Sequence, residues 1–548
     1  MTWGRFRLAV LRCIVGASVM AFWGAGAWAA TINVPGDQAT IQGAIDAASD
    51  GDKVVVAAGT YFERIDFKGK AISVASASGP AKTTINGKGV GPVVTFSSGE
   101  TPASTLSGFT ITGGVNDDLG DGGGILVHDS SPTISGNTIT GNSACSGGGG
   151  IAVQFSAATI QSNTITNNSQ SGCSGGVGGG GIELGGAGAA MVLSNVISHN
   201  SWTSGDGGGI SLFAAGTPVI MNNLISDNQA SGVFSAGPVA SGGGIAMFND
   251  SAALVEQNLI INNSSDIGAG VYFGVPFSST GPTLINNTIF GNSATQAKGA
   301  AIYADGFPST AALYNNLLLA PSTQNVVFCD TTRSNIPPTF GNNDVFGLGT
   351  AFANCGDIAG TSGNFAADPL FVDSGGGDFH LTSGSPAIDV GLNSEAGFSA
   401  TDYYGNPRIV EGKAGDGAIV DVGAAEFGPV TTSEAKLRVT PRRIDFPNTA
   451  MGKHSRGEQV VLFNPRTSRQ DAPVVIESFE ISGSFIVDPI KSTCSADESL
   501  APGSECHFTL RFMPISVSGQ TGTFTINDNS AVRSTSTVML KGKGTSGK

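Results

Sequence analysis

Apolar and polar residues alternate along the first two thirds of the chain in a short motif that recurs six times. The motif has the spacing Asn-x-Ile-x-x-Asn and occupies residues 137–142, 163–168, 195–200, 223–228, 258–263 and 287–292. Beside these copies lie runs of small residues that end in an aliphatic side chain, as in the GGGI run from Gly122 to Ile125. Alternation over a few residues is the pattern of a β-strand. Each repeat is therefore predicted to form two short strands.

A repeat this short cannot bury its own apolar face, so successive repeats must stack. Stacked coils would place the Ile, Val and Leu side chains in interior columns and run backbone hydrogen bonds from coil to coil. Asparagine tolerates left-handed turns and glycine allows close backbone approach, so both are interpreted as framework residues. Tandem helices and a propeller are the alternatives, but the richness in Gly, Asn, Ser and Thr disfavours helices. The sequence thus predicts an all-β fold with a parallel β-helix as its body.

One helix is expected near the start of this body, from Thr40 to Ala48. Ile41, Ala44 and Ile45 would lie on one face of it together with Ala48. Such a helix would cap the open N-terminal end of the stack and protect its edge from pairing with other chains.

The spacing between repeats varies at one turn only. From the GGGI aliphatic residue to the next Asn the gap is 12 or 13 residues in the first five repeats, whereas from the last Asn to the next aliphatic residue it runs from 8 to 17. In a solenoid, insertions at one turn gather along one face, and that is where binding usually resides. We call it the variable-loop face; it includes Cys145, Cys173, Trp202, Phe234 and Pro238.

The N-terminus has the features of a secretory signal peptide, assigned to residues 1–30. Arg5, Arg7 and Arg12 precede or enter an apolar stretch that reaches Trp28, and small residues close it around Ala29. A membrane anchor is the alternative, but glycines interrupt the apolar stretch. No later stretch could span a bilayer. We therefore expect a protein that is secreted, held at the cell surface or kept in the periplasm.

Six cysteines follow the signal, an even number in a chain bound for an oxidising compartment, so disulfides are expected. Their order along the chain favours the pairs Cys145 with Cys173, Cys329 with Cys355, and Cys494 with Cys506. Six cysteines allow fifteen connectivities, and the spacing alone does not select among them.

Charge divides the mature chain into two unlike parts. Residues 31–429 hold 10 Lys and Arg against 31 Asp and Glu, whereas residues 430–548 hold 14 against 11. An acidic body repels nucleic acid and polyuronates at long range. Nucleic acid is therefore not expected as a partner. A polysaccharide or cell-surface glycan stays open as a partner.

Several segments carry a resemblance to known families. The opening NVPGDQATIQGAIDAASDGDKVVVAAGTYFE at 33–63 resembles the first coil of the pectin-lyase-like superfamily, and the coils to about 320 resemble bacterial right-handed β-helix repeat proteins. The runs DPLFVD, GDFHL, SPAID, GNPR and DVGAAEF between 368 and 427 are similar to the closing coils of secreted proteins of the choice-of-anchor kind. The resemblance implies a right-handed parallel β-helix over 31–428, with closing coils at 340–428.

The pattern changes at about residue 434 to alternating strands. With LAPGSECHFTLRFMP at 500–514 and GTFTI at 522–526, this part resembles the Ig-like domain of the abnormal-spindle and hydin class. A small Ig-like β-sandwich is therefore predicted over 434–548.

The superfamily includes pectate lyases and polygalacturonase-type hydrolases, so an enzyme must be weighed. The lyases use a calcium-binding acidic group and an Arg or Lys base, but no Lys or Arg lies between Lys88 and Lys298. Hydrolases need carboxylates about 5 to 9.5 Å apart. Asp121 and Asp206 hold matching positions three coils apart, roughly 14 Å at about 4.8 Å per coil, and are not expected to pair.

Other candidate side chains have competing structural readings. Asp117, Asp118 and Asp121 could hold calcium through oxygen ligands, or could form a solvated loop. His128 and His199 have no partner at a recognisable motif spacing. His380, within GDFHL, follows the structural pattern of the family that the closing coils resemble.

Three functions remain open. The first is a non-catalytic exported scaffold that binds a glycan or another surface component through the variable-loop face, with rings that stack on the ligand. The candidate rings are Trp202, Phe234, Tyr272 and Phe277, each of which could instead serve loop packing. The second is a polysaccharide-active enzyme acting outside the central coils, near Arg333 or Arg408, or on a neutral polysaccharide. The third is a structural stalk or adhesin.

Overall fold

The structure of the chain is a computed structural model, and a defined set of residues is described in it. These are residues 29–117, 120–172, 178–232, 239–275, 279–306, 310–320, 323–332, 336–356, 358, 360–413, 415–428, 437–464, 473–496, 498–501, 503–529 and 535–546.

The body is a stack of coils whose strands pair in parallel, each with the same segment of the next coil. We name its four sheets A to D. Sheet A consists of β1 (Thr31–Val34), β2 (Lys53–Val56), β5 (Ser73–Ser76), β8 (Thr105–Ser107), β12 (Thr133–Ser135), β16 (Thr159–Gln161), β20 (Met191–Leu193), β24 (Val219–Met221), β28 (Leu254–Glu256), β32 (Thr283–Ile285), β36 (Ala312–Tyr314) and β39 (Thr339–Gly341). Sheet B consists of β3 (Gly59–Tyr61), β6 (Thr83–Asn86), β9 (Thr110–Thr112), β13 (Thr138–Thr140), β17 (Thr164–Thr166), β21 (Val196–Ser198), β25 (Leu224–Ser226), β29 (Leu259–Ile261), β33 (Thr288–Phe290), β37 (Leu317–Ala320) and β40 (Asp344–Gly347).

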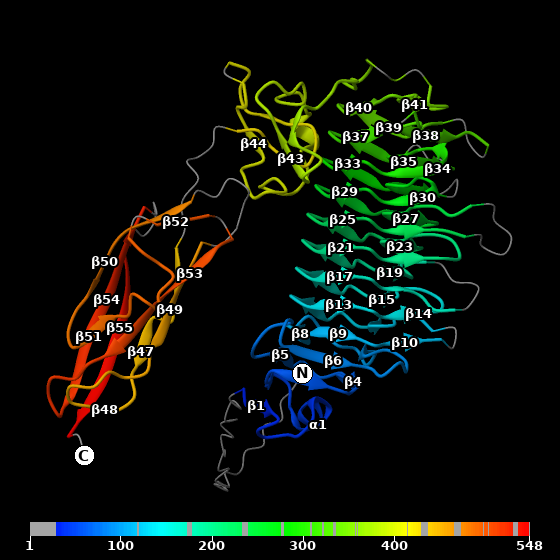
Figure 1. Ribbon diagram of the computed structural model, residues 1–548. Helices are drawn as coiled ribbons and strands as arrows, with labels where there is room; N and C mark the ends of the chain where they lie inside the picture. Colours follow the sequence, from blue (N-terminus) through cyan, green and yellow to red (C-terminus); the bar gives the residue numbers. More distant parts are fainter. Residues whose placement is uncertain are drawn as a thin grey trace, which may run out of the picture.

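Sheet C runs the length of the stack, whereas sheet D has only seven strands and is limited to the middle coils (Figure 1). Sheet C consists of β4 (Ile65–Asp66), β7 (Val94–Phe96), β11 (Ile125–His128), β15 (Ile151–Gln154), β19 (Ile182–Gly185), β23 (Ile210–Phe213), β27 (Ile245–Phe248), β31 (Val271–Gly274), β35 (Ile302–Asp305), β38 (Val327–Asp330) and β41 (Phe352–Ala353). Sheet D consists of β10 (Val115–Asn116), β14 (Ser143–Ala144), β18 (Ser169–Gln170), β22 (Ser201–Trp202), β26 (Gln229–Ala230), β30 (Ser264–Ile267) and β34 (Ser293–Lys298).

The predicted interior columns are present. Ile125 pairs in register with Ile151, and the same column continues through Ile182, Ile210 and Ile245, all of them without solvent exposure. Burying one such side chain contributes about 1.5 to 3 kcal/mol. The apolar columns therefore hold the coils together, and the predicted all-β parallel β-helix is confirmed.

Asparagine side chains form ladders at the turns between the sheets. Asn137 donates from both its backbone N–H and its side-chain amide to Oδ1 of Asn163, at 2.9 and 3.1 Å, and Asn163 repeats the pattern toward Asn195. A second ladder starts at Asn142 and Asn168. Because these buried amides find partners at every step, their role is structural.

The helix α1 (Ile41–Ala47) lies at the N-terminal end of the stack. The Thr40 hydroxyl caps it by accepting a hydrogen bond from the N–H of Gly43 at 3.0 Å. Ile41, Ala44 and Ile45 are buried in the same apolar core as the first strands. The helix thus covers the end of the interior column.

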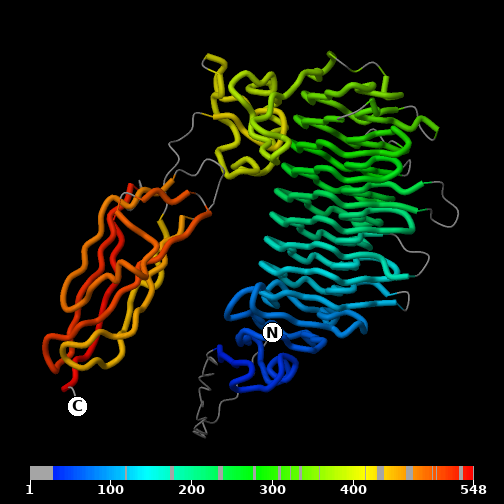
Figure 2. The backbone as a smooth tube through the Cα atoms, in the orientation of Figure 1, coloured from blue at the N-terminus to red at the C-terminus, as the bar shows by residue number. Residues whose placement is uncertain are grey.

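Residues 366–428, which we call the closing segment, lie beside the last coils (Figure 2). They contain the antiparallel pairs β42 (Phe371–Asp373) with β43 (Asp378–Leu381) and β44 (Ile409–Val410) with β45 (Ile419–Val420), and the 3-10 turn η1 (Asn393–Glu395). The parallel ladders end near Phe365. Closing coils were expected over 340–428, but residues 366–428 lie beside the stack and add no further coil on top of it.

The outward side chains of sheet B explain that position. Strands β13 and β17 carry threonines outward, whereas β29 and β37 carry Leu259, Ile261, Leu317 and Leu319. These four side chains are buried against apolar residues of the closing segment. An apolar outer face needs a cover, and the chain supplies it from its own next segment.

Residues 437–546 form a small, mainly antiparallel β domain with its own core. One sheet has the order β46 (Arg438–Thr440), β49 (Glu458–Phe463), β53 (Glu505–Phe512), β51 (Phe485–Val487), and the other the order β47 (Arg443–Asp445), β55 (Thr535–Thr545), β54 (Gly519–Asp528), β50 (Val474–Ile481), β52 (Glu498–Leu500), with β48 (Thr449–Ala450) also on β55. Leu462, Phe508, Phe524 and Val538 are fully buried. The predicted small β domain after the β-helix is confirmed.

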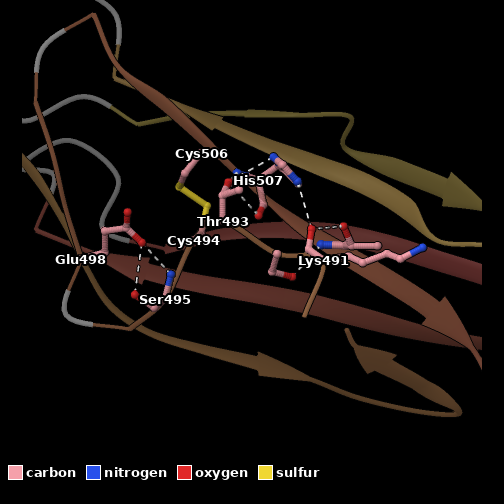
Figure 3. The surroundings of a disulfide bond; sticks show 9 residues. Lys491, Thr493, Cys494, Ser495, Glu498, Cys506 and His507 are labelled. Carbon is pink, nitrogen blue, oxygen red and sulfur yellow. Dashed lines mark hydrogen bonds between the residues drawn. A yellow bond between two sulfur atoms is a disulfide. The ribbon is translucent and has the colours of Figure 1, made fainter. Parts of the chain in front are cut away.

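Two predicted disulfides are present. Cys329 of β38 is bonded to Cys355, and Cys494 is bonded to Cys506 of β53 (Figure 3). Cys145 is also disulfide-bonded, but Cys173, its expected partner, lies outside the described residues. In the described part of the chain, no helix is long and apolar enough to cross a membrane.

Candidate functional site

The outer face of sheet C is the candidate site, because it adjoins the variable loops and carries most of the unusual side chains. In each four-residue strand the first and third residues point into the core and the second and fourth point outward. The second positions are Leu126, Ala152, Glu183, Ser211, Ala246, Tyr272, Tyr303 and Phe328, and the fourth are His128, Gln154, Gly185, Phe213, Phe248, Gly274, Asp305 and Asp330.

Two phenyl rings are exposed on this face. Phe155, directly after β15, is 58% exposed, and Phe213 at the end of β23 is 39% exposed. They belong to coils two apart, so about 10 Å separates their strands. The ring of His128 meets Phe155 edge-on with centroids 5.9 Å apart. The face therefore offers aromatic surface to solvent.

Phe155 holds an unusual backbone conformation. Its φ is +52°, a left-handed value that is rare for a bulky side chain. The neighbouring coil makes room for the ring, since a Cβ at Gly186 would lie 2.5 Å from Cδ1 of Phe155. Asp129, Gly186, Ala214 and Asn249 hold the same position in neighbouring coils with φ between +48° and +68°, so the left-handed turn belongs to the repeat. At this turn the bulky Phe155 adds strain of about 1 to 3 kcal/mol.

Among the residues that the structure describes, the acid Glu183 has no cationic partner. It is 1% exposed, and the Gln154 amide donates to both of its carboxyl oxygens, at 2.7 and 2.6 Å. The side chain lies over Gly147 of the preceding coil, where a Cβ would come within 2.8 Å of its Cγ. Burial, and then the charge of Asp121, raise the pKa of Glu183 to about 8. The carboxyl group is therefore largely protonated at neutral pH.

Asp206 and Asp121 border the same face. Burial raises the pKa of Asp206 to about 6, against the effect of hydrogen bonds from the Ser241 hydroxyl and N–H at 2.5 and 2.9 Å. Burial also raises the pKa of Asp121, and His128 opposes that shift. The absence of Lys and Arg from residues 89–297 leaves these carboxyl groups without a cation from the central coils.

The later coils carry a ladder of rings. Tyr272 stacks on Tyr303 with centroids 5.5 Å apart, and Phe248 and Phe328 extend the ladder at 5.2 and 5.1 Å. The Tyr272 hydroxyl donates to Asp305 at 3.1 Å, and burial raises the pKa of this tyrosine. These contacts fix the rings to each other, so this part of the face is packed.

The rings chosen from the sequence are placed differently from the exposed ones. Trp202 is 0% exposed and Tyr272 is 8% exposed, so neither presents a ring face to solvent. Phe234 and Phe277 lie outside the described residues. Their roles in ligand stacking stay predictions.

The candidate calcium ligands are only partly placed. Asp117 is exposed, Asp121 is half-buried beside Glu183 and His128, and Asp118 lies outside the described residues. Within the described ranges, no group of three or more His, Cys, Asp or Glu side chains is arranged to hold a metal ion. The calcium site stays a prediction.

The alternative site near Arg408 is enclosed. Arg408 is fully buried in the closing segment, where it donates to the carbonyl of Gly423 at 2.5 Å and lies 3.7 Å from Glu426. Arg333 lies outside the described residues. In this geometry the Arg408 guanidinium holds the segment together and does not reach solvent.

Sequence reasoning did not select Glu183, Phe155 or Phe213. The signal for Glu183 was present, because this acid directly follows a GGGI run, where the other GGGI repeats carry Leu, Ala or Ser. The signal for Phe155 was a large ring at the position held in the next coil by Gly186. Each signal is a departure from the repeat. It can be recognised only after the sequences of successive coils are aligned, and the loops between those coils differ in length.

A match to a known protein family agrees with the β-helix architecture seen in the structure. Residues 123–318 match the family model for the right-handed β-helix region. Together with the parallel ladders, this match makes the body a right-handed β-helix repeat structure. No curated protein matches the chain.

Two solved structures are similar to parts of the chain. An ASH/PapD-like domain of human CEP192 is 13% identical over 22% of this chain and 92% of that one, with a TM-score of 0.17. The secreted serine protease VesC from Vibrio cholerae is 10% identical over 20% of this chain and 23% of that one, with a TM-score of 0.16. These scores are too low to support an inference about fold or function.

Proposed function

We propose that this protein is an exported, non-catalytic scaffold that binds a neutral glycan on the outer face of sheet C. The observation that carries the proposal is Phe155, a largely exposed ring held on strained backbone and seated over Gly186. Aromatic rings bury much surface at low entropic cost and are suited to stacking on sugar rings. Phe213, two coils further, supplies a second ring at a spacing that suits an oligosaccharide.

The charge of the face selects the kind of glycan. Asp121 and Asp206 border the face that carries the rings, Glu183 lies within it, and Lys and Arg are absent from residues 89–297. An anionic sugar would lack a cationic partner here and would meet the carboxylates of Asp121 and Asp206. A neutral polysaccharide or cell-surface glycan meets neither obstacle.

Export is part of the proposal. The disulfides Cys329–Cys355 and Cys494–Cys506 suit an oxidising compartment, and the N-terminal sequence has the features of a signal peptide. The resemblances to the pectin-lyase-like superfamily, to choice-of-anchor proteins and to the Ig-like class belong to the same proposal. They favour a secreted or surface-attached scaffold with an attachment module at its C-terminus.

The test is direct binding of the mature full-length chain to an array of neutral and acidic polysaccharides, with and without calcium. Phe155→Ala and Phe213→Ala should each weaken binding about tenfold. Phe62→Ala is the matched control, since Phe62 is also 58% exposed but lies outside the candidate face. Equal binding by all four proteins would exclude the proposed face.

The same array tests the catalytic alternative. Release of new reducing ends or unsaturated products, lost in Glu183→Gln, would replace the scaffold with a polysaccharide-active enzyme. We expect no turnover, because Glu183 is enclosed and hydrogen-bonded to Gln154.

A further inference from the structure

A separate cleft lies between sheet B and the closing segment, with a volume of about 310 Å³. Leu224 of β25 and Leu259 and Ile261 of β29 form its apolar floor. Phe379, Tyr403 and Tyr404 contribute from the closing segment. Small-molecule sites are clefts of about this size, mostly apolar and aromatic, with a few polar groups.

The tyrosines of the cleft are held rigidly. Asp402 accepts hydrogen bonds from the N–H groups of Tyr404 and Asn406, at 2.9 and 2.7 Å, and the Tyr403 N–H donates to the carbonyl of Ala424 at 2.9 Å. The ring of His380 stacks on Tyr404 with centroids 3.7 Å apart. A wall fixed in advance loses little entropy when a ligand binds.

Among the polar side chains that line the cleft, Asp227 and Asn262 come from adjacent coils. Asp227 follows β25 and Asn262 follows β29, both exposed and both with φ of +57°. The N–H of Asp227 donates to the carbonyl of Ile261, which sets the two residues side by side about 4.8 Å apart. Within the described residues, no hydrogen bond reaches either side-chain head group.

From this arrangement we infer that the cleft binds a sugar ring of a neutral saccharide. The half-buried Leu224 and the rings of Tyr403 and Tyr404 would contact the C–H face of the sugar ring. The Asp227 carboxylate would accept hydrogen bonds from its hydroxyls, and the Asn262 amide would both donate and accept. In the described part of the chain no Lys or Arg lines the cleft, so the Asp227 charge disfavours uronates and phosphates.

This site is distinct from the face in the proposed function. The cleft is built on sheet B and the closing segment, whereas Phe155 and Phe213 belong to sheet C and its following turn. Its test can therefore fail without the other failing. If both hold, the protein engages a glycan at two places on the β-helix.

The experiment is isothermal titration of the mature full-length chain with maltotriose, cellotriose, xylotriose and mannotriose, and with trigalacturonate as the acidic counterpart. At least one neutral trisaccharide should bind, and trigalacturonate should not. Asp227→Asn and Asn262→Gly should each weaken that binding about tenfold. Both replacements tolerate the left-handed backbone, so the variants keep the fold.

Asn167→Gly is the matched control. Asn167 holds the same turn position two coils before Asp227, with φ of +55°, but does not line the cleft. Binding lost in Asn262→Gly and kept in Asn167→Gly supports the cleft. Binding unchanged in Asp227→Asn and Asn262→Gly but lost in Phe155→Ala overturns the cleft and leaves the sheet C proposal standing. No binding of any neutral trisaccharide by the wild type overturns the cleft as well.

Discussion

The ring of Phe155 lies directly over Gly186 of the next coil, so close that any Cβ at Gly186 would meet it at 2.5 Å. This pair joins a strained backbone, an exposed ring and a position where the neighbouring coil must be glycine. The exposed aromatic surface of sheet C therefore depends on two coils, because one supplies the Phe155 ring and the next supplies the space at Gly186.

Replacing Gly186 should displace the ring and destabilise the fold. In Gly186→Ala the new methyl group clashes with Phe155 and also sits at a φ of +68°. Gly136→Ala is the control, since Gly136 has a φ of +63° and nothing within 4 Å of the added Cβ. Both variants carry the backbone strain, of about 1 kcal/mol. We expect the melting temperature to fall more in Gly186→Ala than in Gly136→Ala, and we expect only Gly186→Ala to lose glycan affinity. Equal losses of melting temperature in the two variants would show that the Phe155 ring moves aside at little cost.

Replacing Phe155 should separate stability from binding. Asn tolerates positive φ, so Phe155→Asn should raise the free energy of unfolding by about 1 kcal/mol while abolishing binding at the ring. Phe213 lies in β23 and is absent from the positive-φ residues, so Phe213→Asn should reduce binding without stabilising. Chemical denaturation and the glycan array measure the two effects. A destabilised Phe155→Asn would mean that ring packing outweighs the backbone strain.

The framework could be predicted from sequence because it repeats. Asn137 and Asn163 occupy equivalent places in a motif, and stacking gives both the same physical role. The fold class follows from that equivalence alone.

The candidate site could not be predicted in the same way, because it consists of departures from the repeat. Glu183 is buried only because Gly147 leaves space beside it, and Gln154 reaches it only because Gly185 is also a glycine. Such relations cross between coils whose connecting loops differ in length. Likewise, the apolar Leu259 and Ile261 fit the motif, and nothing local shows that a later segment covers them.

Glu183 should give the fold a dependence on pH. Its pKa rises from 4.5 in the unfolded chain to about 8 in the fold, so folding favours the protonated acid. That contribution is complete below about pH 4.5 and is lost as pH rises through about 8. Glu183→Gln removes the titration, and its melting temperature should fall less than that of the wild type between about pH 5 and pH 9.

Other groups titrate nearby and set the control. Asp121 and His128 face the same region, and Asp206, with a pKa of about 6, should act in a lower window. Asp206→Asn should therefore change the profile between about pH 4 and 6 and leave the alkaline limb intact. If the melting temperatures of wild type and Glu183→Gln fall equally with pH on the alkaline side, the Glu183 carboxyl is not held protonated in the fold.

Glu256 should control whether the closing segment stays on the β-helix. Its Oε1 in β28 accepts hydrogen bonds from the N–H groups of Phe398 and Ser399, at 2.8 and 3.0 Å, across more than a hundred residues of sequence. Charged acceptors of this kind contribute about 1.5 to 3 kcal/mol each. Glu256→Ala should therefore loosen the segment, with faster hydrogen exchange at those two amides and faster proteolysis. Glu256→Gln keeps an oxygen acceptor, so its hydrogen-exchange and proteolysis rates should lie between those of the wild type and those of Glu256→Ala.

The control for Glu256 lies within the segment itself. Asp416 is exposed, so Asp416→Ala removes an acid without removing an anchor. If the segment loosens in Glu256→Ala, the cleft that holds Tyr403 and Tyr404 should widen and lose its trisaccharide, whereas Phe155 and Phe213 on sheet C should bind as before. Unchanged exchange at Phe398 and Ser399 would instead mean that the apolar contacts of Leu259, Ile261, Leu317 and Leu319 hold the segment without help from the carboxylate.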